Sequence, residues 1–442
     1  MKELSLPATI AGASRSELQR RTLRVLVMGQ LVGAAALASA VTVGAFVVQD
    51  MLGQDTPWTG LSTAGTTLGT AYMSQVLARV MRRHGRRPGL ELGYALVLVG
   101  GLIAAFGVEH RWLAVFLVGL FLYGNGQAAN LISRYAATDL AEPDERGRAM
   151  SRVVFASTFG AVLGPVLIGP AERAGQAWFG LARYTGPWLF SALFFGASFV
   201  NVAWRLRPDP LVVAGGTGAG ARARSGRMGL VAAMRTIRAS TGARVALLSM
   251  VVTQAVMVAV MAMTSVHLKL HGHEGASQIV VSTHIAGMFA LSPLVGRYTD
   301  RRGALSSIVV GSALLVVANV LATLSGDVVL LFFPSLWLLG MGWTFGLIGG
   351  SNLLIASVPV EHRVALQGTA DLLMSLCGGM AGFASGFVRR AIGFHLLAAA
   401  ATVISGALFV VTRSTRGSSG RSRIGRGRRG CWRRRTATRA PS

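Results

Sequence analysis

The stretch Gly296-Arg-Tyr-Thr-Asp-Arg-Arg-Gly303 separates two long apolar runs, near residues 277–297 and 304–324. Each run has about the 20 residues that a helix needs to cross the roughly 30 Å apolar core of a bilayer. Charges confined to a short connection between two such runs are typical of a loop at a membrane surface. The stretch therefore predicts a pair of membrane-spanning helices joined by a basic loop.

The rest of the chain repeats this pattern. Hydrophobic residues make up 52% of the sequence and charged residues 14%, whereas soluble proteins carry about 25% charged residues. So few charges cannot cover a water-exposed surface, and we predict an all-α membrane protein with about twelve transmembrane helices. The run nearest the N-terminus, at 24–48, lacks a signal-peptide cleavage pattern, so we expect it to be retained as a membrane span. The ten other runs lie near 24–48, 59–81, 91–108, 111–133, 152–171, 186–206, 243–267, 327–349, 367–388 and 392–412.

Two pairs of loop sequences indicate an internal duplication. The basic loop Ala78–Arg87 follows the second run, and its Gly85 lies 218 residues before Gly303. The segment Pro143–Arg146 follows the fourth run, and it begins 216 residues before the similar segment Pro359–Arg363. Two markers at nearly one spacing predict two six-helix pseudo-repeats, as in many secondary transporters.

The chain divides accordingly into five segments. Residues 207–242 are rich in glycine and arginine, which is typical of a flexible linker, and they contain a short basic amphipathic segment. The residues from 413 onward carry eleven arginines in thirty positions, and we expect a disordered tail. The predicted segments are an N-terminal segment 1–23, a first bundle 24–206, the linker 207–242, a second bundle 243–412 and the tail 413–442.

The net charge of +26 is carried almost entirely by arginines in short clusters between apolar runs. This placement favours loops at the cytoplasmic face, against anionic lipid headgroups, over a nucleic-acid surface. Even-numbered loops hold most of these arginines, including Arg86 in the second loop and Arg134 in the fourth. We therefore expect both termini to be cytoplasmic. The sequence contains no constellation typical of an enzyme, a metal site or a nucleotide-binding loop, and we expect no cofactor.

The two basic loops resemble a loop motif of the major facilitator superfamily, and the resemblance covers residues 24–412. It implies that Gly296 lets two helices approach closely. It also implies a cytoplasmic latch made by charged residues of the two loops, and the first loop departs from the pattern with Arg82 in the usual place of aspartate. The residues that match this motif are Arg82, Arg83, Gly85, Gly296, Asp300, Arg301 and Gly303.

The fifth run is similar to a glycine–proline motif of the drug/proton antiporter branch of that superfamily. Its matching residues are Gly160, Gly164, Pro165 and Gly169. Glycines four residues apart make room for helix packing, and proline bends a helix by removing a backbone hydrogen bond. A tightly packed, kinked helix without any role in export explains the same residues.

Two ionisable residues lie inside predicted spans, where charge is costly and therefore indicates function. Asp371 is a candidate proton carrier, or a structural latch that pairs with the basic loop after the second span, where Arg82 stands. His284 is a candidate proton site, because histidine titrates near neutral pH, or a histidine hydrogen-bonded between helices.

Polar uncharged residues in several spans are candidates for contact with a substrate in a central cavity, with packing between helices as the alternative. They are Gln30, Gln127, Asn130, Gln254, Trp343 and Asn352. The resemblance implies proton-coupled export of small amphipathic molecules by a monomer in the plasma membrane of a bacterium. Uptake of a small metabolite such as a vitamin is the nearest alternative, and a membrane-embedded enzyme using His284 or Asp371 is a third.

Overall fold

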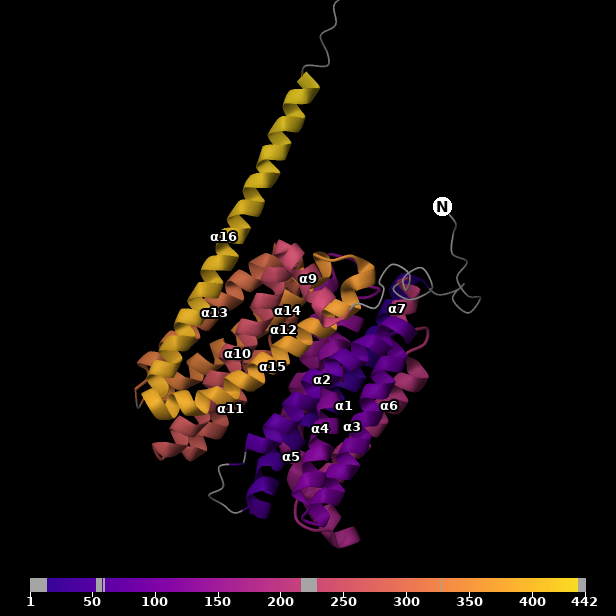
Figure 1. Cartoon of the computed structure of the whole chain (residues 1–442), viewed down its shortest axis with the longest axis vertical. Coiled ribbons are helices and arrows are strands. Elements are labelled where there is room, and N and C mark those ends of the chain that lie inside the picture. The colour runs from indigo at the N-terminus through magenta and orange to yellow at the C-terminus, as the bar shows by residue number, and fades with distance from the viewer. Residues whose placement is uncertain (1–13, 53–57, 59, 216–228, 327, 436–442) are drawn as a thin grey trace, which may run out of the picture.

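The computed structural model describes residues 14–52, 58, 60–215, 229–326 and 328–435, and Figure 1 shows two groups of helices side by side. The N-terminal half comprises α1 (Arg15–Leu52), α2 (Gly60–His84), α3 (Arg86–Glu109), α4 (Leu113–Ala136), α5 (Arg146–Phe179) and α6 (Thr185–Arg205). The C-terminal half comprises α10 (Thr241–Leu270), α11 (Glu274–Phe289), α12 (Ser292–Arg302), α13 (Ala304–Leu324), α14 (Val329–Ala356), α15 (Val360–Ile392) and α16 (Phe394–Arg435). The short helices α7 (Pro210–Val213) and α9 (Leu230–Ala239) lie between the halves in sequence.

Within the described residues, nine helical segments are long and apolar enough to cross a membrane. The prediction of an all-α membrane fold is therefore confirmed. The predicted eighth span consists of two helices, α11 and α12, which are interrupted at Ala290 and Leu291. Pro293 stands in the first turn of α12, where its missing N–H costs nothing because that turn has no intrahelical acceptor for it.

Each half has its own hydrophobic core. In the N-terminal half the ring of Trp188 meets those of Phe116 and Tyr123 edge to face, with centroids 5.3 and 5.4 Å apart. In the C-terminal half, Phe332 and Leu336 of α14 belong to a separate cluster of buried residues. Two nearly independent cores allow each bundle to remain packed if the halves move relative to one another.

The halves meet where α2 crosses α15 and where α5 crosses α12. Glycine permits both crossings, because an added Cβ at Gly368 of α15 would collide with the side chain of Ala78 on α2. At the other crossing, an added Cβ at Gly296 of α12 would collide with the backbone of Gly147 on α5. The second helix of each half thus meets the fifth helix of the other, a symmetric arrangement that supports the proposed duplication.

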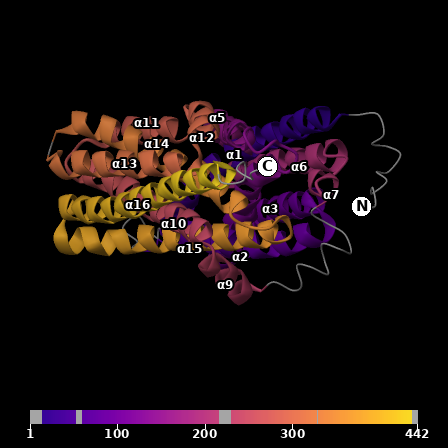
Figure 2. The same cartoon turned by 90° about the horizontal axis from the view of Figure 1, so that it is seen from above.

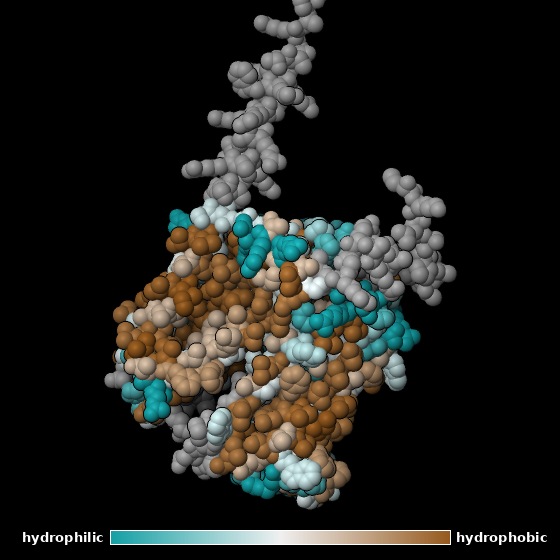
Figure 3. Space-filling view, viewed as in Figure 1, coloured by the Kyte–Doolittle hydropathy of each residue, from teal (hydrophilic) through white to brown (hydrophobic). Residues whose placement is uncertain are grey.

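Both crossings draw the halves together near the end of the molecule where α2 meets α3 and where α12 meets α13. We call this end, with Arg82–Arg87 and Arg297–Arg302, the arginine-rich end. Figure 2 views the molecule along the perpendicular direction and again shows the two halves side by side. Figure 3 shows the surface hollowed between the halves away from the arginine-rich end, with predominantly hydrophobic residues on the outside of both bundles.

The C-terminal tail differs from its prediction. We expected disorder from residue 413, but α16 continues as a helix to Arg435, projecting beyond the bundle in Figure 1. Arginine has a high helix propensity, and a helix already nucleated within the bundle extends at little further cost. Residues 436–442, like 1–13 of the predicted N-terminal segment and 216–228 of the linker, lie outside the described residues.

We predict that Gly368→Leu separates the halves at the arginine-rich end without unfolding either bundle, because the added side chain collides with Ala78. Overpacking costs about 1–3 kcal/mol, so labelling of a reporter cysteine at buried Ser151 should accelerate about tenfold. The measurement is maleimide labelling in a background where Cys377 and Cys431 are replaced by alanine.

Gly406→Leu is the matched control, because an added Cβ at Gly406 meets nothing within 4 Å. Equal labelling rates in the Gly368→Leu variant and in this control would contradict the proposed role of the α2–α15 crossing.

Candidate functional site

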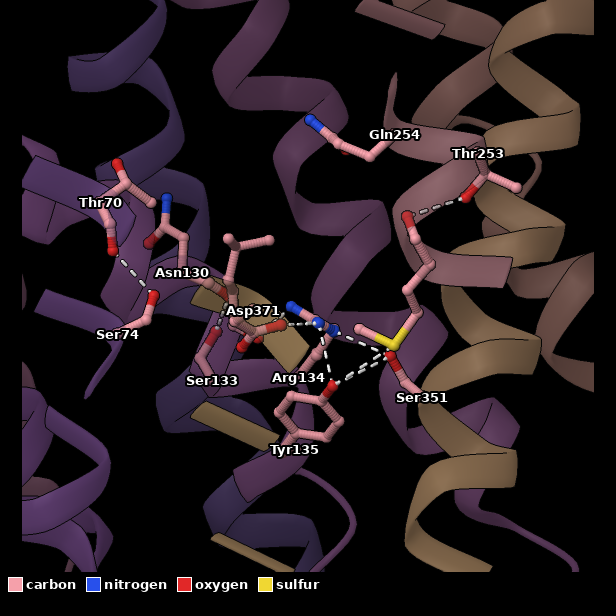
Figure 4. A network of polar contacts seen from close by, with 12 residues as sticks. Thr70, Ser74, Asn130, Ser133, Arg134, Tyr135, Thr253, Gln254, Ser351 and Asp371 are labelled. Atoms are coloured by element: carbon pink, nitrogen blue, oxygen red, sulfur yellow. Dashed lines mark hydrogen bonds and ion pairs between the residues drawn. The ribbon is translucent and has the colours of Figure 1, made fainter. Parts of the chain in front are cut away.

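A buried ion pair joins the two halves. Arg134 near the end of α4 donates from one terminal nitrogen to Asp371 Oδ1 of α15 at 2.5 Å, and the side chains are 1% and 0% exposed. The same guanidinium donates to the Tyr135 hydroxyl at 3.2 Å and, through Nε, to Ser351 Oγ of α14 at 3.2 Å. Figure 4 shows Arg134 between Asp371 and Ser351, with Tyr135 beside them. With Met250 of α10, 4.0 Å from the Tyr135 hydroxyl, these residues form the Arg134 cluster.

The two buried charges of the Arg134 cluster, on Arg134 and Asp371, each need the other as a partner. Desolvating two charges costs several kcal/mol each, and only close contact with good hydrogen bonds offsets that cost. Asp371 Oδ1 accepts a hydrogen bond from Arg134, whereas Oδ2 is buried and has no hydrogen-bond partner among the described residues. Separating the halves would leave either charge unpaired in a low-dielectric region unless water or a proton reached it. Close contact with Arg134 is therefore the arrangement in which both charges are compensated.

A second arginine joins the halves one helical turn nearer the start of α15. Arg86, at the start of α3, is 1% exposed and holds both carboxylate oxygens of Asp139, at 2.7 and 3.1 Å. It also donates to Gln367 Oε1 of α15 at 3.0 Å. Burial raises the pKa of the Asp139 carboxyl, which lies in the loop after α4, and the Arg86 guanidinium opposes that rise. Arg86 thus fastens the α2–α3 loop to the other half.

Asp300 makes the third connection, at the α5–α12 crossing. Its carboxylate accepts hydrogen bonds from the backbone N–H groups of Gly147 and Arg148, at 2.7 and 2.9 Å, and from Arg148 Nε at 3.3 Å. These groups form the first turn of α5, where unpaired N–H groups and the helix dipole favour an anion. Asp300 of the C-terminal half is therefore bound by the N-terminal half.

The structure changes two details of the predicted latch. Asp371 pairs with Arg134, and not with the loop after α2 where Arg82 stands. Arg134 lies inside α4, and not in the loop where the sequence pattern places it. Asp300 binds the start of α5, and Arg301 is exposed, with no hydrogen bond or ion pair in the described part of the chain. Arg82 and Arg83 lie in the last turn of α2, a favourable position for cations.

The motif glycines have distinct roles. Gly85 and Gly303 precede α3 and α13 with φ of 104° and 87°, a conformation that favours glycine. Gly160 faces α1, where an added Cβ would collide with Ala34 and Ala35, whereas Gly169 has nothing within 4 Å. Gly164 and Pro165 lie within α5, and their side-chain surroundings fall outside the described residues.

His284 is fully buried in α11, and its Nδ1 lies 2.9 Å from the carbonyl oxygen of Leu336 on α14. Its Nε2 has no hydrogen-bond partner among the described residues. This is the arrangement expected of a histidine hydrogen-bonded between helices. It lies within the C-terminal half, so the structure does not bring it together with Asp371 into one polar cluster.

Of the predicted cavity residues, three pack within or between bundles. Gln30 donates to Ser157 Oγ at 2.8 Å and accepts from Ser133 at 3.0 Å, all within the N-terminal half. Asn130 is 7% exposed, and Asn352 donates to the carbonyl oxygen of Ile348 in its own helix.

The other three lie on the far side of the Arg134 cluster, toward the hollow. Gln127 is exposed on α4, two helical turns from Arg134 on the same face. Gln254 of α10 follows Met250 by one turn, and it accepts a hydrogen bond from Trp343 Nε1 of α14 at 2.7 Å. These residues provide amide groups and an aromatic surface where the halves diverge.

We predict that removing one member of the buried ion pair is far costlier than removing both. Arg134→Leu or Asp371→Leu alone should destabilise the closed arrangement by about 3–5 kcal/mol, because an unpaired charge remains buried. The double variant should lose much less than the sum, as measured by thermal unfolding in lipid nanodiscs.

The exposed pair Arg183–Glu172, 3.1 Å apart, is the matched control, and its loss should cost less than about 1 kcal/mol. Additive effects of the two substitutions at the Arg134 cluster would show that the pair does not act as a unit.

We also predict that replacing Asp300 weakens the α5–α12 crossing much more than replacing its neighbour Arg301. Asp300→Ala removes three hydrogen bonds from the start of α5 and should weaken the α5–α12 crossing by about 2 kcal/mol. Arg301→Ala should change it by less than about 0.5 kcal/mol, because the side chain is exposed. Distances between spin labels on α5 and α12 measure the effect. Equal broadening of the distance distribution in both variants would contradict the prediction.

The described geometry matches known transporters in fold. The human organic anion transporter MFSD10 (TETRAN) superposes on this chain with a TM-score of 0.72 at 16% identity. The superposition covers 89% of this chain and 99% of the transporter. A bacterial homologue of the iron transporter ferroportin, in an outward-facing state, superposes with a TM-score of 0.69 at 14% identity, covering 89% and 98% of the two chains. At these identities the likeness concerns the fold.

Sequence relatives are closer. An uncharacterized MFS-type transporter of Bacillus subtilis, YdeG, is 37% identical over 420 residues, which are 93% of this chain and 96% of the relative. The riboflavin transporter RfnT of Brucella anthropi is 27% identical over 381 residues, or 86% and 91% of the two chains. The family model described as Major Facilitator Superfamily matches residues 25–274. With two bundles that meet in a buried polar cluster and relatives aligned over nearly its whole length, this chain belongs to the major facilitator superfamily of membrane transporters.

Proposed function

We propose that this protein is a secondary active transporter of a bacterial plasma membrane that exports small amphipathic molecules in exchange for protons. One observation carries the proposal most directly. Two bundles with separate cores are fastened at one end by the Arg134 cluster, Arg86 and Asp300, and the surface is hollowed between them away from that end. Such an arrangement suits alternating access, in which the halves rock about a central site.

The orientation follows from the arginines. Basic loops face the cytoplasm in most multi-pass membrane proteins, so we place the arginine-rich end and both termini there. The described conformation is then closed toward the cytoplasm and hollowed toward the outside. In this orientation the basic loops lie beside anionic lipid headgroups.

Asp371 is the proposed coupling residue within this cycle. A proton that reached its carboxylate from the hollow would remove the charge that binds Arg134, and the cost of separating the halves would fall. Its buried Oδ2, which lacks a hydrogen-bond partner among the described residues, is the oxygen available to receive that proton. His284 keeps a secondary place, because its hydrogen bond to α14 already gives it a packing role.

A second candidate function is uptake of a vitamin-like metabolite by the same fold. The observation that favours it is the 27% identity to a riboflavin transporter over 86% of the chain. The glycine-rich face of α5, with Gly160 packed on α1, is compatible with either direction of transport. Members of this superfamily are transporters, so the membrane-enzyme hypothesis is set aside.

We predict that the reconstituted protein moves an amphipathic cation, ethidium, against an imposed pH gradient, and that a pH dye reports matching proton flux. Asp371→Asn should abolish the coupled flux, because the residue can then neither carry a proton nor bind Arg134 as an ion pair. His284→Phe, which removes the titratable ring but keeps its bulk, should retain at least half of the flux.

Riboflavin is assayed in the same liposomes. Riboflavin movement without ethidium movement would replace the export proposal with the uptake candidate. No pH-gradient dependence for either molecule, with a protein shown to be folded, would refute proton coupling.

A further inference from the structure

Two glutamine side chains from opposite halves flank the hollow just beyond the Arg134 cluster. On α4, Gln127 is one turn from Leu131, which packs in the hydrophobic core of the C-terminal half, so Gln127 faces that half. On α10, Gln254 is one turn from Met250, whose sulfur lies 4.0 Å from the Tyr135 hydroxyl of the N-terminal half. Both positions therefore face the opposite bundle, on the side of the cluster away from the arginine-rich end.

The orientation of the Gln254 amide is set by its neighbour. The indole N–H of Trp343 can only donate, so the atom 2.7 Å from it is the Gln254 carbonyl oxygen, and the amide nitrogen points away. Figure 4 shows this nitrogen directed toward the helices of the N-terminal half. No hydrogen-bond partner for it is found among the described residues. Gly378 of α15 leaves room for the side chain, because an added Cβ there would lie 2.7 Å from Gln254 Cγ.

The surroundings of this amide are uncharged. Both charges of the Arg134–Asp371 pair are buried and directed at one another, at 1% and 0% exposure, so neither is presented to the hollow. The ring of Phe289 is partly buried and meets that of Trp343 edge to face, with centroids 5.9 Å apart, so a second aromatic ring adjoins the indole that holds the amide. A ligand here meets an oriented N–H donor, an aromatic ring and, across the gap, the exposed amide of Gln127.

We infer that this site takes neutral, flat molecules that carry a carbonyl oxygen, which accepts a hydrogen bond from Gln254 Nε2 while the ring of the ligand packs against Phe289. Gln127 supplies a second polar contact from the other half. Trp343 is a positioning residue, which acts on the ligand through Gln254. The inference rests on the proposed transport function, whose central site it defines chemically.

The test compares three small probes: coumarin, which has a ring carbonyl; 2H-chromene, which lacks it; and indole, which offers only a donor. Affinities are measured by thermophoresis with the full-length protein in lipid nanodiscs, corrected with empty nanodiscs. The wild-type protein should bind coumarin about fivefold more tightly than 2H-chromene, the effect of one neutral hydrogen bond. Gln254→Leu should abolish this preference, and so should the near-isosteric Gln254→Glu, whose carboxylate has no N–H to donate.

Trp343→Phe separates positioning from packing. Without the indole N–H, the Gln254 amide can rotate and present its oxygen, so indole binding should strengthen while the preference for coumarin narrows. Equal weakening of all three probes would instead indicate a purely structural role for Trp343. The matched control is Gln176→Leu, at an exposed position near the end of α5, which should leave all affinities unchanged.

Retention of the coumarin preference in Gln254→Leu, or failure of the wild-type protein to distinguish coumarin from 2H-chromene, overturns the inference. Either result leaves ethidium or riboflavin transport in the liposome assay intact. Absent transport with the coumarin preference and its Gln254 dependence preserved would refute the proposed function and support the binding site. The two proposals can therefore fail separately.

Discussion

The contact between Arg134 and Asp371 is the interaction on which the rest of the arrangement depends. It is the one point at which a full positive charge and a full negative charge from different halves are both removed from solvent in the described structure. Such a pair is weak as a source of overall stability, but it is demanding in geometry, because a small separation leaves two desolvated charges. The small residues at the two helix crossings give the close approach that the pair requires. Gln254 and Trp343 then lie one to two turns beyond it, at a depth that the pair determines.

The remaining polar contacts between the halves reinforce this design. Arg86 acts on α15 through Gln367, one turn before Asp371, so two arginines of the N-terminal half hold neighbouring turns of one helix. At the other crossing, Asp300 uses the amides of α5 and not a lone side chain, which fixes helix position as well as charge. Since each bundle keeps its own hydrophobic core, these contacts can form and break while both cores stay intact.

Much of the fold follows from the sequence, because runs of about 20 apolar residues and basic loops at one spacing leave few alternatives to two six-helix bundles. The site is predicted less well. The apolar pattern places Arg86 and Arg134 in loops, because each helix extends three to five residues beyond its apolar run, into positions where burial depends on the other half. A pairwise partner such as Arg134 for Asp371 is a tertiary fact that no local pattern contains. The helical continuation of α16 was missed for a different reason, since composition predicts disorder for an isolated tail and takes no account of the preceding helix.

The distribution of charge across the interface has a consequence for what can pass it. At the arginine-rich end the C-terminal half contributes the carboxylates Asp300 and Asp371, and the N-terminal half contributes Arg134, Arg148 and the amides of α5. At the level of these contacts, separation of the halves leaves carboxylates on one side of the gap and guanidinium and amide groups on the other. The resulting transverse field aligns a dipolar molecule and draws an ion of either sign to one side. A neutral cargo would cross this level with less retention than an ion, and a dipolar one would be oriented as it passes.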